Sequence, residues 1–237
     1  MEESENAVGI IVAAGKGERM SGPVRKQYRF LGPFPMLVHS LFAFEQSRLI
    51  NSIILVVDPS DLEFCRTQIL GPYQFQKTVQ ITPGGETRQR SVYNGLKLVT
   101  KNCDIVVVHD GARPLVSQFV IDKSVEIARE FGACIVAVPA HDTIKLVEDH
   151  FVQTTLPRNQ VWIAQTPQTF KRGLIIEAHE RALKEGVKGT DDAALIERLG
   201  FKVRVLQGDY RNIKITTLSD LKVADAFLNM GESRLVL

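Results

Sequence analysis

Residues 9–20 read GIIVAAGKGERM, an apolar run that passes directly into a turn of small residues and glycines. Similar apolar runs recur along the chain, the last of them more alternating, and together they span 8–13, 52–58, 104–110, 133–139 and 201–207. Continuous apolar strands are buried on both faces, as in a parallel sheet that lies between helices. Because helical patterns separate these runs, the sequence predicts an α/β fold with a doubly wound, mostly parallel sheet.

The helical patterns have apolar residues at helical spacing, with polar residues or glycines at their ends. Ser91, Ser117 and Thr190 are residue types that cap helix N-termini, and Gly132 and Gly200 are suited to ending helices. We therefore expect helices at about 35–44, 91–99, 117–131, 190–199 and 218–228.

The segment 142–162, DTIKLVEDHFVQTTLPRNQVW, departs from this alternation because it consists of two extended stretches around an Asp-His tip. A two-stranded hairpin is only marginally stable by itself in water, so an arm of this kind needs a partner surface. We expect one domain over residues 1–237, with a β-hairpin arm at about 140–162 that joins two copies of the chain into a homodimer.

The composition excludes several classes of protein. Lys and Arg total 29 against 27 Asp and Glu, an even balance that gives no support for binding to nucleic acid or to a membrane surface. Three widely spaced cysteines without a C-x-x-C pair are typical of reduced thiols. The acidic start MEESENAV does not look like a signal peptide, and no apolar run approaches the ~20 residues of a membrane span. A soluble cytoplasmic protein is expected.

The glycine turn of residues 13–22 fits neither common phosphate-binding motif. A dinucleotide fingerprint needs a third glycine where Met20 stands, and a carboxylate near position 40, where the sequence reads HSL. A Walker loop needs Lys and then Ser or Thr at the positions that Pro23 and Val24 occupy. The turn therefore predicts a different nucleotide cradle, or else a plain tight turn with solvated charges.

Small residues in this turn, Ala13, Ala14 and Gly15, allow backbone N–H groups to approach a phosphate or a base closely. Arg19 and Lys26 add two cations within one loop. Positioned cations stabilise the charge that develops on a transferred phosphoryl group, so the loop is a candidate triphosphate site.

Asp110 ends the buried strand of the motif VVVHDGARP, at the sheet edge where open α/β proteins bind ligands. A single carboxylate beside phosphates is a common protein ligand of Mg²⁺, although a turn-stabilising aspartate is the alternative. His109 is better interpreted as a packed, hydrogen-bonded histidine than as a ligand. The stretch TPGGETRQRSVYNG places Gly84 and Gly85 where their backbone could face a flat ligand, a weak signal by itself.

Taken together, eight motifs resemble one family, the cytidylyltransferases that act on 2-C-methyl-D-erythritol 4-phosphate in the non-mevalonate isoprenoid pathway. They occur in order from residue 10 to residue 216: IIVAAGKGERM, RKQY, PGGETRQRSV, VVVHDGARP, HDTIK, LPRNQVWIAQTPQTF, GTDDA and GDYRNIKIT. The resemblance implies a Rossmann-like nucleotidyltransferase fold, CTP and methylerythritol phosphate as substrates, a divalent metal such as Mg²⁺, and a homodimer joined by the arm.

The resemblance also implies roles for individual residues. Those implied to stabilise the reacting phosphates are Arg19, Lys26 and Lys214. Those implied to bind the nucleotide are Ala13, Ala14, Gly15, Gly85, Glu86, Arg88 and Ser91. Those implied to bind the acceptor are Arg113, Thr143, Arg158, Thr166 and Thr190, with Thr143 and Arg158 serving the neighbouring subunit. Asp110 is implied to be the metal-linked carboxylate.

The sequence favours this function over three others. A ribitol 5-phosphate cytidylyltransferase shares the QTPQTF and KITT motifs, but it tends to have LAGG in the first loop, where this chain has VAAG. A dinucleotide-dependent oxidoreductase is disfavoured by Met20 and by the missing ribose carboxylate. A nucleotide-binding regulator without activity would not need Arg19, Lys26, Asp110 and Lys214 together. Small departures from the family pattern are Pro157 before Arg158, and Glu86 where some relatives have Asp.

Overall fold

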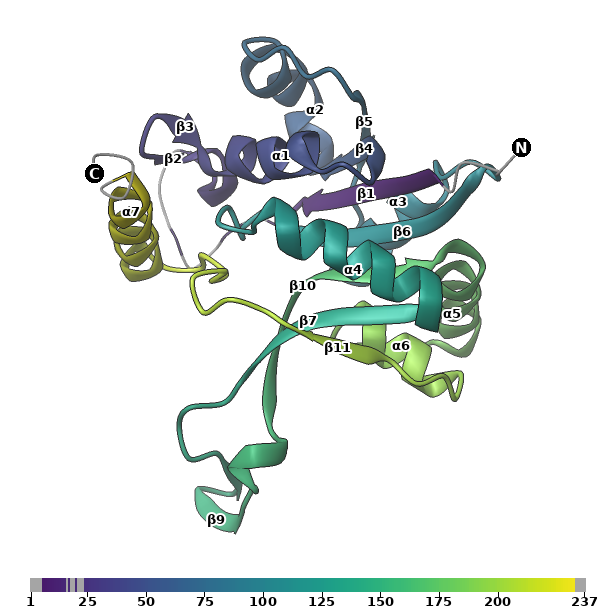
Figure 1. The fold of residues 1–237 in the computed structure, drawn as a ribbon, viewed down its shortest axis with the longest axis vertical. Coiled ribbons are helices and arrows are strands. Elements are labelled where there is room, and N and C mark those ends of the chain that lie inside the picture. Colours follow the sequence, from purple (N-terminus) through teal and green to yellow (C-terminus); the bar gives the residue numbers. More distant parts are fainter. Residues whose placement is uncertain (1–5, 16, 18–19, 21–23, 233–237) are drawn as a thin grey trace.

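The central feature of the computed structural model is a seven-stranded sheet with the order β11-β7-β10-β6-β1-β4-β5 (Figure 1). The structure describes residues 6–15, 17, 20 and 24–232. The strands are β1 (Asn6–Ala13), β4 (Ile50–Val57), β5 (Thr78–Pro83), β6 (Cys103–Asp110), β7 (Ala133–Pro139), β10 (Trp162–Lys171) and β11 (Arg204–Gln207). All neighbouring strands pair in parallel except β10, which is antiparallel to both β6 and β7. The predicted doubly wound, mostly parallel α/β sheet is confirmed.

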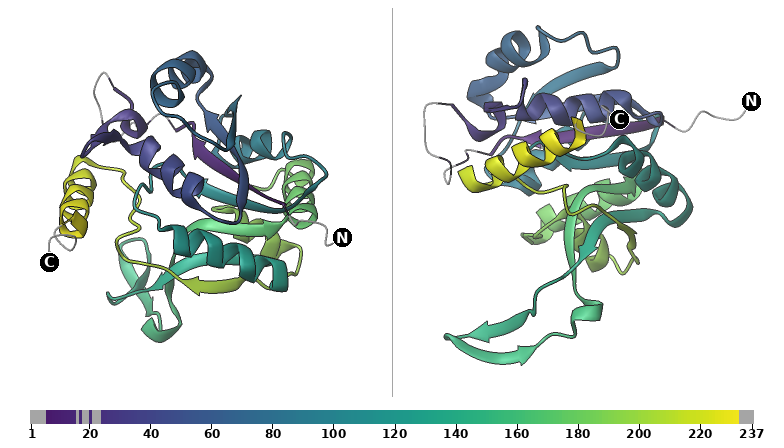
Figure 2. Two further views of the ribbon diagram at one scale, coloured as in Figure 1. Left: turned by 45° about the horizontal axis from the view of Figure 1, so that its top comes forward. Right: turned by 60° about the vertical axis from the view of Figure 1, so that its left-hand side comes forward.

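Helices cover both faces of the sheet, as the left view of Figure 2 shows. One face packs against α1 (Met36–Gln46) and α4 (Gln118–Phe131), and the other against α3 (Arg88–Leu96), α5 (Arg172–Glu185) and α6 (Asp192–Arg198). Alternate residues of β4 separate accordingly: Ile53 and Leu55 lie in the first core, Ile54 and Val56 in the second. Each fully buried aliphatic side chain contributes about 1.5–3 kcal/mol, which explains why these strands are continuously apolar.

Smaller elements complete the chain. The short strands β2 (Phe30–Leu31) and β3 (Phe34–Pro35) form a hairpin, and α7 (Leu218–Glu232) packs against β2. Single turns of helix occur at η1 (Lys26–Tyr28), η2 (Pro59–Asp61) and η4 (Arg158–Gln160), and the short α2 (Leu62–Phe64) leads into the π-helical η3 (Cys65–Leu70). No helix in the described part of the chain is long and apolar enough to cross a membrane. All three cysteines are free and buried, as expected.

The predicted helix ends are partly right. Ser117 caps α4 by accepting a hydrogen bond from the Val120 N–H at 3.3 Å, and Gly132 ends that helix with a φ of 89°. The other two predicted caps are wrong. Thr87 and Asp191 supply the capping oxygens of α3 and α6, so Ser91 lies inside α3 and Thr190 precedes the α6 cap.

Several elements have no counterpart in the prediction, among them the edge strand β5, the helix α5 and the central strand β10. β10 is hard to recognise because Gln165, Thr166, Gln168 and Thr169 are all buried in it, which interrupts the apolar pattern. Their polar atoms are satisfied by neighbours, as where the Thr169 hydroxyl lies 2.8 Å from the Ser124 hydroxyl. Hydrogen-bonded side chains can therefore replace apolar ones in this central strand.

The expected hairpin around the Asp-His tip is present. Its strands β8 (Lys145–Glu148) and β9 (Phe151–Thr155) pair in antiparallel fashion, and Asp149 and His150 both have positive φ, 49° and 66°. A two-residue turn with positive φ at both positions matches the right-handed twist of the flanking strands. The arm extends away from the body of the protein, as the right view of Figure 2 shows, and every residue of its two strands is exposed.

Candidate active site

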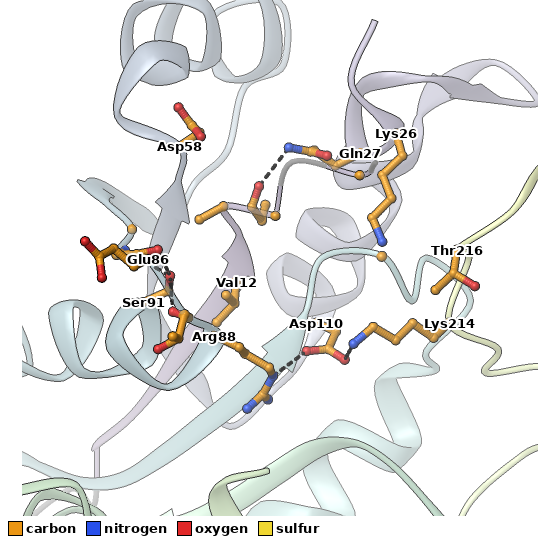
Figure 3. A pocket seen from close by; sticks show the side chains of 18 of the residues that line it. Val12, Lys26, Gln27, Asp58, Glu86, Arg88, Ser91, Asp110, Lys214 and Thr216 are labelled. Atoms are coloured by element: carbon orange, nitrogen blue, oxygen red, sulfur yellow. Dashed lines mark hydrogen bonds and ion pairs between the residues drawn. The ribbon is translucent and has the colours of Figure 1, made fainter. Parts of the chain in front are cut away.

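A cavity of about 840 Å³ lies beyond the carboxyl ends of β1, β4, β5 and β6 (Figure 3). In an open α/β sheet this edge is where ligands bind, because loops from adjacent parallel strands diverge there and leave a crevice. The cavity brings together ten residues that the sequence analysis assigned to the site: Ala13, Ala14, Gly15, Lys26, Gly85, Glu86, Arg88, Ser91, Asp110 and Lys214. Arg19 lies outside the described residues.

Two glycine turns approach each other closely at one end of the cavity. A Cβ atom on Gly84 would lie 2.3 Å from the Ala14 Cβ, so a side chain at position 84 would push the two loops apart. A Cβ atom on Gly15, by contrast, would meet nothing within 4 Å. The first turn therefore leaves open space beside its backbone, as the prediction of a nucleotide cradle requires.

Ser91 fixes the second glycine turn. Its hydroxyl oxygen accepts a hydrogen bond from the Gly85 N–H at 3.0 Å and lies 3.0 Å from the Thr87 carbonyl oxygen, to which it donates. The residue is 2% exposed, so the hydroxyl is held in place. Ser91 lines the cavity, and its hydrogen bonds hold the shape of this turn. The Glu86 side chain, in the same turn, is exposed.

Asp110 lies between two cations on the cavity wall. Its Oδ1 atom is 3.0 Å from Arg88 Nε, and its Oδ2 atom is 2.8 Å from Lys214 Nζ. Burial alone would raise the pKa of the Asp110 carboxyl, but the charges of Arg88, Lys214 and Arg113 outweigh it and hold that pKa well below its usual range. Asp110 is therefore ionised at neutral pH.

Arg88 spans two carboxylates. Besides Asp110, its Nη1 atom contacts Asp192 Oδ2 at 2.8 Å, and Asp192 Oδ1 lies 3.0 Å from His179 Nε2. Asp192 is 1% exposed and does not line the cavity. The guanidinium of Arg88, predicted to bind the nucleotide, thus forms a planar bridge that also orients Asp110.

Two amines point into the same space from different parts of the chain (Figure 3). Lys26 Nζ donates to the Ile215 carbonyl oxygen at 3.3 Å, and Lys214 precedes that residue. The segment is held beside β6 because the Ile215 N–H donates to the Ala112 carbonyl oxygen at 2.8 Å. Lys26 and Lys214 therefore converge on the cavity although 188 positions separate them in the sequence.

Two predicted acceptor residues lie behind Asp110, outside the cavity lining. The Thr166 hydroxyl accepts a hydrogen bond from the Asp110 N–H at 3.1 Å and lies 2.9 Å from His109 Nδ1. Burial lowers the pKa of His109 to about 4, so this packed histidine is neutral, in agreement with the sequence interpretation. Arg113 is 9% exposed and donates to the Asn212 carbonyl oxygen at 2.7 Å.

The other predicted acceptor residues lie away from the cavity. Thr143 and Arg158 belong to the arm and are exposed, and Arg158 donates to the His141 carbonyl oxygen at 3.1 Å. Thr190 is exposed beside the start of α6. Among the described residues that line the cavity, none comes from the arm.

The cavity also includes residues that the sequence analysis did not assign to the site, among them Gln27, Asp58, Thr87 and Thr216. A signal for Asp58 was available, because it follows a buried strand just as Asp110 ends one. Gln27 and Thr216 stand inside the RKQY and KIT motifs, but nothing in their spacing shows that they meet.

Comparison with known proteins decides which family has this arrangement. The family model described as 2-C-methyl-D-erythritol 4-phosphate cytidylyltransferase matches residues 7–230. The chain belongs to this family. The family predicted from the eight motifs is thereby confirmed.

Individual members of the cytidylyltransferase family are similar over nearly their full length. The 2-C-methyl-D-erythritol 4-phosphate cytidylyltransferase of Caldanaerobacter subterraneus subsp. tengcongensis is 46% identical over 224 residues, which cover 94% of this chain and 99% of that protein. The enzyme of the same name from Alkaliphilus oremlandii is 47% identical, over 96% of this chain and 97% of that protein.

A solved structure of the family shares the fold. The crystal structure of 4-diphosphocytidyl-2C-methyl-D-erythritol synthase from Anaerococcus prevotii superposes with a TM-score of 0.86 at 34% identity, over 96% of this chain and 97% of that one. The nucleotidyltransferase-like α/β fold that the motifs implied is thus confirmed.

Proposed function

We propose that this chain transfers CMP from CTP to 2-C-methyl-D-erythritol 4-phosphate, giving 4-diphosphocytidyl-2-C-methyl-D-erythritol and pyrophosphate, in isoprenoid precursor biosynthesis. Family membership over residues 7–230 supports the reaction. The observation that carries the assignment to this site is the cavity, in which two glycine turns face Lys26, Lys214 and Asp110. Such a cavity suits a nucleoside triphosphate, since backbone groups approach the nucleotide and cations meet its phosphates.

The mechanism follows from the charges around the cavity. The acceptor phosphate is already ionised near neutral pH, so it attacks the α-phosphorus of CTP without a strong general base. Lys26 and Lys214 donate to the phosphate oxygens that gain charge at the transition state. Arg19 is proposed to be a third cation that stabilises the reacting phosphates. Rate enhancement then comes from positioning and electrostatic stabilisation.

The cavity fits a divalent metal ion such as Mg²⁺ with Asp110 as its protein ligand. Among the described residues, no group of three or more His, Cys, Asp and Glu side chains is arranged to hold a metal. Asp110 does present an ionised carboxylate at the cavity wall. Mg²⁺ is usually held by one or two carboxylates plus phosphates and water, and a bound ion would neutralise phosphate charge. Lys214 would share this carboxylate with the metal.

The arm supports the proposal of a homodimer built from one domain per chain. Large apolar side chains cluster on the arm and at its base, with exposed fractions of 41–74%: Leu146, Val147, Phe151, Val152, Trp162 and Ile163. Large exposed apolar side chains gathered on one segment are typical of an interface. In the dimer, Thr143 and Arg158 would reach the acceptor side of the partner's cavity, where the negatively charged phosphate needs a cation.

Phe151→Asp is expected to convert the homodimer into monomers, because it puts a charge into the apolar surface of the arm. Phe119→Asp is the matched control, since Phe119 is 72% exposed against 74% for Phe151 but lies on α4. Sedimentation equilibrium measures the mass of each variant. A dimeric Phe151→Asp variant, or a monomeric wild-type protein, would contradict the proposed interface.

Pyrophosphate release with CTP and Mg²⁺ tests the reaction, with methylerythritol 4-phosphate and ribitol 5-phosphate as alternative acceptors and ATP and UTP as control nucleotides. We expect release only with CTP and methylerythritol 4-phosphate. The relatives named above carry methylerythritol in their names, so the comparisons give no support to the ribitol alternative. Preference for ribitol phosphate would overturn the acceptor assignment. No pyrophosphate release with either acceptor would overturn the proposed reaction.

A further inference from the structure

Arg25, which immediately precedes Lys26, joins the glycine-loop side of the cavity to the end of β4. Its guanidinium makes three contacts in that region: Nη1 to Asp58 Oδ2 at 2.8 Å, Nε to Asp61 Oδ2 at 3.2 Å, and Nη2 to Ser60 Oγ at 2.8 Å. The three side chains of these ion pairs are mostly buried, 28% exposed for Arg25, 16% for Asp58 and 14% for Asp61. The planar fork of an arginine suits several acceptors at once, which a lysine cannot match.

The residues after Lys26 are anchored as well. The Gln27 Nε2 atom donates to the Ala13 carbonyl oxygen at 2.8 Å, and the Tyr28 hydroxyl donates to Asp61 Oδ2 at 2.9 Å. Gln27 is 2% exposed and Tyr28 is 6% exposed. Lys26 and Gln27 both line the cavity, but of the two only Lys26 carries a charge, and its neighbours on both sides are fixed.

These anchors matter because η1 is only three residues long. A single turn of 3₁₀ helix has poor hydrogen-bond geometry and does not hold its shape alone. The direction of the Lys26 side chain must therefore come from tertiary contacts, and Arg25 supplies the ionic ones. Asp61 links both sides, since it accepts from Arg25 and from Tyr28.

Arg25 also balances negative charge at the cavity. Asp58 lines the cavity beside Pro59, and its hydrogen bond with Arg25 is the main reason why the pKa of its carboxyl lies well below its usual range. Among the described residues, Arg25 is the cation that pairs with both Asp58 and Asp61, at a site proposed to accept a triphosphate.

We propose that Arg25 is a positioning residue for the reaction, which holds η1 against the end of β4 so that the Lys26 amine points at the reacting phosphate. The inference rests on the proposed function for the role of Lys26, but the anchoring itself can be measured without turnover. The alternative is an ordinary surface ion pair, which contributes little to stability or to the position of Lys26.

Hydrogen exchange tests the anchoring directly. The Tyr28 N–H donates to the Arg25 carbonyl oxygen at 3.0 Å, and the Arg29 N–H donates to the Lys26 carbonyl oxygen at 3.2 Å. We expect Arg25→Ala to speed exchange of these two amides at least tenfold while amides of β6 keep their wild-type rates. Arg66→Ala is the matched control, because Arg66 is 62% exposed and its ion pair with Glu63 measures 3.8 Å. Unchanged exchange in Arg25→Ala would overturn the proposal.

A double-mutant cycle with Lys26→Met tests whether Arg25 acts through Lys26. We expect Arg25→Ala to lower kcat about tenfold in the wild-type background and less than twofold in the Lys26→Met background, with Arg25→Lys intermediate. Equal losses in both backgrounds would show a general effect on the fold and overturn the proposal. Should the wild-type protein not release pyrophosphate at all, the proposed function fails, while hydrogen exchange still decides whether Arg25 anchors the segment.

Discussion

Replacing Lys26 or Lys214 with methionine is expected to lower kcat for pyrophosphate release at least a hundredfold. Methionine keeps most of the length and apolar contact of the lysine side chain but removes its charge and its N–H donors. Both amines converge on the cavity beside Asp110. Each substitution would therefore remove the stabilisation that one amine gives to the phosphate oxygens in the transition state. A hundredfold change corresponds to about 3 kcal/mol, within the range for a lost electrostatic contact in a water-poor site.

Initial rates at saturating CTP and acceptor would measure this loss, with Lys101→Met as the control. Lys101 is exposed in the turn before β6, so it lies at the other end of the strand that Asp110 terminates. Thermal unfolding of each variant shows whether the fold is retained. Near-wild-type turnover in both Lys26→Met and Lys214→Met would remove these lysines from the mechanism.

Asp110→Asn is expected to reduce both activity and stability. The amide has the same shape as the carboxylate but no charge, and its N–H group would face the ammonium of Lys214 or the guanidinium of Arg88. Removing one partner from a buried ionic cluster costs about 3 kcal/mol in free energy of unfolding. We expect kcat to fall about a thousandfold, because the proposed metal ligand and the orientation of Lys214 are lost together.

Urea unfolding without nucleotide measures the stability part of this prediction, and pyrophosphate release measures the activity part. Asp104→Asn makes a matched control: Asp104 lies on the same strand and is exposed, so its replacement is expected to change the free energy of unfolding by less than about 0.5 kcal/mol. A wild-type free energy of unfolding in Asp110→Asn would mean that the ionic cluster adds no net stability. Full activity would exclude Asp110 from the site.

β1, β4, β6 and β7 could be predicted from the sequence because their burial on both faces leaves a continuous apolar run. β10 could not, since its buried glutamines and threonines are stabilised by partners from distant segments, such as Ser124 on α4. The caps of α3 and α6 were misplaced by a few residues for a local reason. Thr87 and Ser91 are both able to cap a helix, and the sequence does not show which hydroxyl finds a free N–H.

The site residues at strand ends could be predicted for the same reason that the strands could. The sequence does not separate residues that line the cavity from residues one layer behind it, because that depends on tertiary burial. Thr166 and Arg113 were grouped with the acceptor site, yet in the structure they support Asp110 and the segment that carries Lys214. The roles proposed for Thr143 and Arg158 depend on a second copy of the chain and stay predictions.

The docking of residues 213–216 beside β6 has a consequence for partial unfolding of the protein. All seven strands of the central sheet end by Gln207, so no strand pairing in that sheet depends on Lys214. The amine of Lys214 is held at Asp110 by a segment whose Ile215 N–H donates to the Ala112 carbonyl oxygen. Local detachment of this segment would therefore withdraw a proposed catalytic amine from the cavity while the sheet stays intact.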